Sequence, residues 1–257
     1  MTALGIAILI IGTSVLFAAL GVVFVRRSMH GHVGKGHNDV LVPLFLTAGT
    51  LYAVLLGFLV IAVWENYGAA KDNAAEEAST LTTLYRQTNG MPATEQQSLR
   101  TLIREYTEDV VSKEWPIQAQ TGGASPLARK ALGDMYRAFS TMKPAVASSS
   151  ISVAFLQTLN NVADDRNRRT LQANEHLSPI LWLGLLIGGI IVVGMTFLLY
   201  MEQTWPHVLG SGLMAALIGT LLFMTFLLNT PFSGPMALSA ESFEHSLVVY
   251  HSVDQGN

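Results

Sequence analysis

The sequence contains no cysteine and few charged residues. Without cysteine there is no disulfide framework, no thiolate nucleophile and no Cys-based zinc or iron–sulfur centre. Charged residues make up 13% of the 257 positions, whereas an average soluble domain carries roughly 25%. The net charge of −3 gives no reason to expect nucleic-acid binding, which requires a concentrated basic surface. The shortage of charge indicates that lipid surrounds much of the chain.

The charges that are present gather in one segment. Between Glu65 and Glu175 lie 12 of the 15 Lys and Arg residues and 13 of the 18 Asp and Glu residues. A helix needs about 20 apolar residues to cross the hydrocarbon core of a membrane. Four stretches satisfy this without any Asp, Glu, Lys or Arg: residues 4–25, 41–64, 177–200 and 208–228.

These stretches predict an all-α integral membrane protein with four transmembrane helices and a helical extramembrane domain between helices 2 and 3. The expected parts are transmembrane helices 1 and 2 in residues 1–64, the extramembrane domain in 65–176, transmembrane helices 3 and 4 in 177–229, and a tail with a short amphipathic helix in 230–257.

Positive charges near the spans indicate two opposite orientations of the chain in the membrane. The first span has neither the basic segment nor the cleavage site of a secretory signal, so we expect a retained anchor. The short loop after it is the only one rich in positive charge, and the positive-inside rule places that loop in the cytoplasm and residues 65–176 outside. Three arginines close to the third span argue for the opposite side: Arg166, Arg168 and Arg169.

Helical signals recur through residues 65–176. Helix formers continue the second span as far as Thr88, and Asn89-Gly90 breaks it. A second helix is expected from a capping box at Thr94 and Gln97 to about Trp115-Pro116. Ser125 before Pro126 predicts the start of a third helix, which ends near Lys143. The last helix is expected from Ser150 through Pro179 into the third span, with a kink at the proline.

No motif for catalysis or for a cofactor is present, so we do not expect an enzyme. The sequence has no G-x-S-x-G elbow, no glycine-rich phosphate loop and no H-E-x-x-H pattern. His30, His32 and His37 lie close together, but the glycines around them fix no ligand geometry, so no metal site is predicted.

The spans contain no acidic or basic residue, which argues against pumps and proton-driven carriers but allows a channel. Thr47, Thr50 and Tyr52 are possible pore-facing polar groups, but interhelical hydrogen bonds are the more common use of such residues in spans. Trp64 and Glu65 stand where the second span leaves the lipid, either as an interfacial anchor or as a pore mouth.

Small residues in the third and fourth spans favour close helix packing. Gly184 and Gly188 have the G-x-x-x-G spacing, which fits both packing within one subunit and oligomerisation. We favour packing within the subunit.

Several segments resemble an uncharacterised bacterial family of membrane proteins described as bestrophin-like. The segments are Asn38-Asp39, the run from Gly49 to Phe58, Val63-Trp64-Glu65, the helix from Glu76 to Arg86, Tyr106, Glu114-Trp115-Pro116 and the turn Pro231-Phe232-Ser233-Gly234. The resemblance covers essentially the whole chain. The family commonly has an acidic residue two positions before Pro231, where this chain has Asn229.

Bestrophins are chloride-conducting oligomers whose pore is lined by the second span. The resemblance therefore implies a homo-oligomeric ion channel, anion-conducting, in the bacterial inner (plasma) membrane, with several passes through the lipid and a small inorganic ion as its ligand. Phe58, Trp64 and Glu65 would line the pathway. Bestrophins also hold the domain between spans two and three in the cytosol, which contradicts the orientation from the first loop.

The tail allows a further expectation. The turn Pro231-Phe232-Ser233-Gly234 would be either a rigid re-entry turn or a simple helix terminator, and the tail helix after it would lay Phe243, Leu247 and Tyr250 on the membrane face. The alternative function is a non-conducting membrane sensor or scaffold that acts through the helical extramembrane domain.

Overall fold

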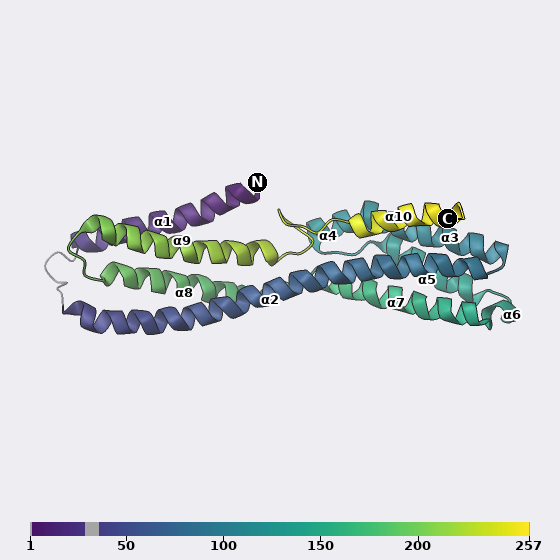
Figure 1. The fold of residues 1–257 in the computed structure, drawn as a ribbon, viewed down its shortest axis with the longest axis horizontal. Coiled ribbons are helices and arrows are strands. Elements are labelled where there is room, and N and C mark those ends of the chain that lie inside the picture. Colours follow the sequence, from purple (N-terminus) through teal and green to yellow (C-terminus); the bar gives the residue numbers. More distant parts are fainter. Residues whose placement is uncertain (1, 29–35, 257) are drawn as a thin grey trace. The chain divides into compact units, whose positions relative to one another are not determined.

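The computed structural model describes residues 2–28 and 36–256, and every regular element in those ranges is helical (Figure 1). The predicted all-α fold is confirmed. The elements are α1 (Ala3–Ser28), α2 (His37–Gln87), the 3₁₀ turn η1 (Thr88–Gly90), α3 (Ala93–Asp109), the π-helical turn η2 (Val110–Glu114), α4 (Trp115–Thr121), α5 (Pro126–Ser140), α6 (Pro144–Ala147), α7 (Ser150–Gln172), α8 (Pro179–Leu198), α9 (Thr204–Leu228) and α10 (Glu241–Asp254).

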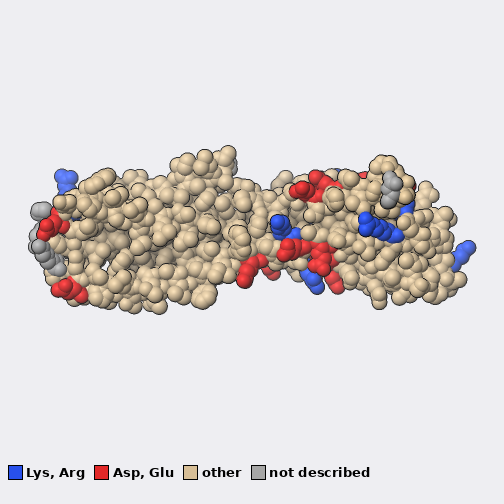
Figure 2. All heavy atoms as spheres, in the orientation of Figure 1, with Lys and Arg blue, Asp and Glu red and all other residues tan. Residues whose placement is uncertain are grey.

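The chain divides into two compact units. The membrane unit comprises residues 1–65 and 176–229, and the extramembrane unit comprises residues 66–175 and 230–257. Among residues 2–28 and 36–256, four helices are long and apolar enough to cross a membrane: α1, α2, α8 and α9. In the face of the membrane unit that Figure 2 shows, charged atoms lie near the ends of the helices, and the apolar length between those ends shows none. The four predicted spans are therefore confirmed as helices.

Small residues allow the helices of the membrane unit to pack closely. Tyr52 on α2 lies over Gly188 and Gly189 on α8. An added Cβ would stand 2.7 Å from the Tyr52 ring at Gly188 and 3.0 Å from the Tyr52 hydroxyl at Gly189. The Tyr52 hydroxyl donates a hydrogen bond to the Leu185 carbonyl at 3.1 Å. On α9, a Cβ at Gly219 would stand 3.0 Å from Ser14 of α1. The expectation that Gly188 serves packing within the subunit is confirmed.

Asparagine side chains tie together the ends of the membrane helices. At the start of α2, the amide of Asn38 donates to the Tyr200 carbonyl at 3.0 Å and accepts from the Tyr200 N–H at 2.8 Å. At the other end, Asn229 Oδ1 accepts from the Leu177 N–H at 2.7 Å. Each bond satisfies a backbone group that lies outside the helical hydrogen-bond pattern.

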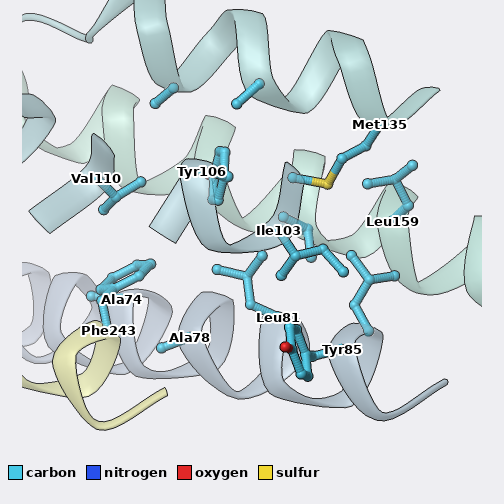
Figure 3. Close-up of a cluster of buried hydrophobic side chains, with 14 of the residues drawn as sticks. Ala74, Ala78, Leu81, Tyr85, Ile103, Tyr106, Val110, Met135, Leu159 and Phe243 are labelled. Carbon is cyan, nitrogen blue, oxygen red and sulfur yellow. The ribbon is translucent and has the colours of Figure 1, made fainter. Parts of the chain in front are cut away.

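The core of the extramembrane unit is formed by five helices around the later turns of α2 (Figure 3). Small side chains of α2 let α10 approach, at Ala74 and Ala78, and larger ones fill the space toward α3, α5 and α7. Burial of one Leu or Phe side chain stabilises the fold by roughly 1.5–3 kcal/mol. The fully buried side chains of this core include Leu81, Leu84, Tyr85, Leu99, Ile103, Tyr106, Met135, Phe155, Leu159 and Phe243.

Two predicted helix boundaries are confirmed. A 3₁₀ turn over residues 88–90 breaks the chain after α2, as Asn89-Gly90 predicts. The Ser125 side chain caps α5, accepting from the Leu127 N–H at 3.2 Å, with Pro126 as the first residue of the helix.

Three other predicted boundaries are wrong. The capping box does not form, because Pro92 occupies the N-cap and no side chain caps α3. Helical structure does not end at Trp115-Pro116, because the π-helical turn η2 leads directly into α4, which ends where Gly122 adopts a φ of 67°. Pro179 does not kink a continuous helix. α7 ends at Gln172, and Pro179 begins α8 behind the cap of Ser178.

The tail does not lie on a membrane face as expected. The side chains of Phe243 and Tyr250 are fully buried in the core of the extramembrane unit, and Leu247 packs against that core. Before α10, Phe232 is also buried, and Gly234 adopts a φ of 85° that favours glycine. The expectation is wrong because the apolar stripe of α10 has a protein surface to cover.

Candidate functional site

One face of α2 in the membrane unit has no partner among the residues that the structure describes. At about 100° per residue, the side of the helix opposite to the buried Tyr52, Leu56 and Val63 is exposed along its length. Its large apolar side chains are 53–69% exposed. This exposed α2 face consists of Thr47, Thr50, Leu51, Val54, Phe58, Ile61 and Glu65.

Four of the six candidate pore residues share this face. Thr47 and Thr50 lie along it, Phe58 is 69% exposed on it, and Glu65 stands at its end. Trp64 is exposed too, but it lies about 100° around the helix from Glu65, so the structure does not bring it onto the face.

The hydroxyl groups of the second span are satisfied within the chain. Thr47 donates to the Pro43 carbonyl at 2.9 Å, and Thr50 donates to the Leu46 carbonyl at 2.7 Å. Within this chain they therefore make intrahelical rather than interhelical hydrogen bonds. Tyr52 points away from the exposed α2 face, and its hydroxyl makes the interhelical hydrogen bond that we expected as the more common use of such a residue. In chemical terms, the face offers apolar walls, two hydroxyl oxygens and one terminal carboxylate.

The extramembrane unit contains a buried ion network that sequence reasoning missed. Arg169 of α7 is fully buried and pairs with Glu77 of α2, with Nε to Oε2 at 2.7 Å and Nη2 to Oε1 at 3.1 Å. Its Nη2 also donates to Glu114 Oε1 at 2.8 Å, and its Nη1 donates to Gln118 Oε1 at 2.8 Å. Arg166 donates to Glu114 Oε2 at 2.6 Å. Two guanidinium groups thus balance two carboxylates.

Neutral groups complete the network. The Tyr106 hydroxyl donates to Glu77 Oε1 at 2.6 Å, and the Ser125 N–H donates to Glu114 Oε2 at 2.7 Å. Burial, together with the neighbouring Glu77, holds the pKa of Tyr106 well above its ordinary value. Burial alone would lower the pKa of Arg169, but the adjacent carboxylates, Glu77 first, raise it. The raised pKa keeps Arg169 charged at neutral pH.

Residues that carry the family resemblance meet at this network. Glu77, Tyr106 and Glu114 belong to it directly, and the π-helical turn η2 ends at Glu114. Trp115 covers it, with the Arg169 guanidinium 5.5 Å from the indole centroid, and Phe232 packs edge-on against Trp115. One signal could have revealed the arginines: they extend the inward stripe of α7, Phe155, Leu159, Val162, Arg166 and Arg169, at spacings of three and four.

The histidine cluster lies mostly outside the residues that the structure describes. His30 and His32 lie outside the residues that the structure describes, and His37 is the first residue of α2. In residues 2–28 and 36–256, no group of three potential ligands could hold a metal ion.

These features define a four-span, all-helical membrane protein with a helical extramembrane domain. A family model described as the Bestrophin-like domain matches residues 12–243, and the chain belongs to this bestrophin-like family. No curated protein matches the sequence.

Solved structures share the fold at low sequence identity. A single-residue variant of a bacterial bestrophin homologue from Klebsiella pneumoniae is 13% identical, with a TM-score of 0.74 over 96% of this chain and 98% of that chain. A second variant of that homologue is 14% identical, with a TM-score of 0.73 over 96% and 97%. A variant of a membrane protein is 14% identical, with a TM-score of 0.71 over 96% and 97%.

Proposed function

We propose that the chain is the subunit of a homo-oligomeric ion channel in the bacterial inner membrane, with the exposed α2 face lining the pathway. The observation that carries the proposal is that this face is exposed from Thr47 to Glu65, while Tyr52, Leu56 and Val63 on the opposite face of the same helix are buried. Membership of the bestrophin-like family supports the same assignment. Copies that assemble with this face around an axis would enclose apolar walls, hydroxyl oxygens and a carboxylate at one end.

The family relation favours an anion as the conducted ion. Glu65 acts against this choice, because a ring of carboxylates at a pore mouth attracts cations. Selectivity between chloride and potassium is therefore the informative measurement, and Glu65→Gln should shift it toward chloride.

The test is reconstitution of the purified chain into liposomes, with chloride and potassium fluxes measured beside the oligomeric mass. Phe58→Ala on the exposed α2 face should change the flux. Leu46→Ala, about 120° around the helix from Phe58 and 60% exposed, is its matched control and should not. Glu105→Gln, an exposed carboxylate on α3, is the control for Glu65→Gln.

The outcomes separate the channel from its alternative. Selective flux from a defined oligomer, altered by Phe58→Ala and unaltered by Leu46→Ala, supports the channel. A monomer or dimer that conducts neither ion overturns it and favours the sensor or scaffold acting through the extramembrane unit.

The side of the membrane that holds the extramembrane unit can be determined directly. The chain has no cysteine, so a single exposed Ser140→Cys on α5 gives one labelling site. The family relation leads us to propose the cytosol. Labelling of intact cells by an impermeant maleimide would contradict that placement and support the orientation indicated by the first loop.

A further inference from the structure

A carboxylate near the end of α10 is held by three donors from other helices. Asp254 Oδ1 accepts from Arg100 Nη1 at 2.7 Å and from the Tyr85 hydroxyl at 2.8 Å. Its Oδ2 accepts from Arg104 Nη2 and lies 3.0 Å from the same hydroxyl. Both carboxylate oxygens are thus engaged, as in the paired binding of a carboxylate or phosphate by arginine.

The three donors are held in position by contacts that do not involve Asp254. Arg100 Nε donates to Thr88 Oγ1 at 3.0 Å, and its Nη2 donates to Asn89. Arg104 Nε donates to the Tyr85 hydroxyl at 3.0 Å. Both guanidinium groups also stand about 5 Å from the centroid of the Tyr85 ring, at 5.0 Å and 5.1 Å. The cradle formed by Tyr85, Arg100 and Arg104 is therefore preorganised, so binding of an anion would not be opposed by the entropy of ordering these side chains.

The cradle opens to solvent. A surface cavity of about 420 Å³ is lined by Tyr85, Gln96, Arg100, Arg104 and Asp254. The side chain of Asp254 is 36% exposed, and those of Arg100 and Arg104 are 18% and 30% exposed. Two positive charges face one negative charge, so the cradle keeps a net positive charge that attracts a second anion.

We propose that Tyr85, Arg100 and Arg104 form a binding site for a small oxyanion, a carboxylate or a phosphate, in which Asp254 is the resident occupant. This ion pair is partly exposed, so screening by solvent limits its contribution to stability. An anion from solution can therefore displace Asp254. Phe243 and Tyr250 anchor the rest of α10 in the core, so the displacement frees only its last turn.

Inorganic phosphate is the probe for the test. It is added to the full-length protein in detergent, and a chloride salt keeps the ionic strength constant. Calorimetry gives the affinity. Asp254→Asn removes the negative charge of the resident carboxylate and leaves both arginines charged. This variant should bind phosphate roughly tenfold more tightly than the wild-type protein. Arg104→Gln should abolish the binding. Arg104→Lys keeps the positive charge but loses the two-point hydrogen bonding of a guanidinium group, so it should weaken the binding severalfold.

Asp134→Asn is the matched control. Asp134 also pairs with two basic side chains, Lys130 and Arg137, but on the single helix α5. Its replacement should leave phosphate affinity unchanged. The proposal is overturned if Asp254→Asn binds phosphate no more tightly than the wild-type protein, or if Arg104→Lys binds it equally well. Loss of phosphate binding would leave the channel proposal untouched, because the two sites share no residue.

Discussion

Arg169 and Glu77 form a two-point ion pair in the interior of the extramembrane unit, and both side chains are 0% exposed. They are separated by 92 positions in the sequence, so the pair joins α7 to α2 directly. Because water cannot compensate either charge, each depends on the other, and Arg169 depends on Glu114 as well. The pair thereby fixes which turn of α7 faces which turn of α2.

Glu77→Gln should destabilise the extramembrane unit strongly. Loss of one partner of a buried ion pair costs about 3–5 kcal/mol, because the other charge is left without compensation. The adjacent Glu76→Gln is the control, since Glu76 is exposed, and it should stay within about 0.5 kcal/mol. Thermal unfolding in detergent compares them. Equal melting temperatures for the two variants would show that the pair contributes nothing.

Gly188→Ala should destabilise the protein and Gly184→Ala should not, although the two glycines lie one turn apart on α8. A methyl group at Gly188 would stand 2.7 Å from the ring of Tyr52, so α8 or the ring must shift, at a cost of about 1–3 kcal/mol. A methyl group at Gly184 meets open space, so the alanine should be neutral or stabilising. Thermal unfolding tests the pair. Destabilisation by Gly184→Ala of similar size would instead indicate a contact with a second copy.

Asn229→Asp should be tolerated and Asn229→Ala should not. Asn229 Oδ1 accepts from the Leu177 N–H, and a carboxylate oxygen can take the same bond. This explains how asparagine can stand where the family commonly has an acidic residue. Alanine leaves the N–H without its partner and should cost about 1 kcal/mol. A variant Asn229→Asp that unfolds as readily as Asn229→Ala would contradict this role.

The parts of the fold that follow from local chemistry could be predicted, and the parts that depend on distant partners could not. Uninterrupted apolar runs defined the spans, and Ser125-Pro126 defined the start of α5. The apolar stripe of α10 fits a lipid surface and a protein core equally well, and only the tertiary fold brings α2 beside it. For the same reason Arg169 was read as a charge near the membrane rather than as a partner of Glu77.

The candidate pore was predictable in part for a related reason. Helical periodicity places Thr47, Thr50 and Phe58 on a common side, but it does not say which side of α2 is packed. That depends on Gly188 and Gly189, which accommodate Tyr52 and so direct the opposite face outward. The pathway itself requires further copies of the chain and stays a proposal.

Asp165→Asn should stabilise the protein at neutral pH. Asp165 of α7 is buried, and burial, together with the nearby carboxylates of Glu76 and Glu77, raises its pKa above the ordinary 3.8. A carboxyl group with a raised pKa in the fold binds its proton more tightly there than in the unfolded chain. Its ionised form is therefore destabilising above that pKa. Asparagine removes the charge and keeps an oxygen that can accept the bond from Thr80, now 3.2 Å long.

The stability difference between Asp165→Asn and the wild-type protein should shrink as the pH falls through the raised pKa, because the wild-type carboxyl then becomes neutral as well. Melting temperatures measured from pH 7.5 to about pH 4 test this, and about 1 kcal/mol corresponds to roughly 2–4 °C. Asp164→Asn, exposed and adjacent, is the control and should change little at any pH. A stabilisation that grows on acidification would contradict the raised pKa. Destabilisation at pH 7.5 would instead show that the charge of Asp165 supports α7, through Arg168 at 3.9 Å.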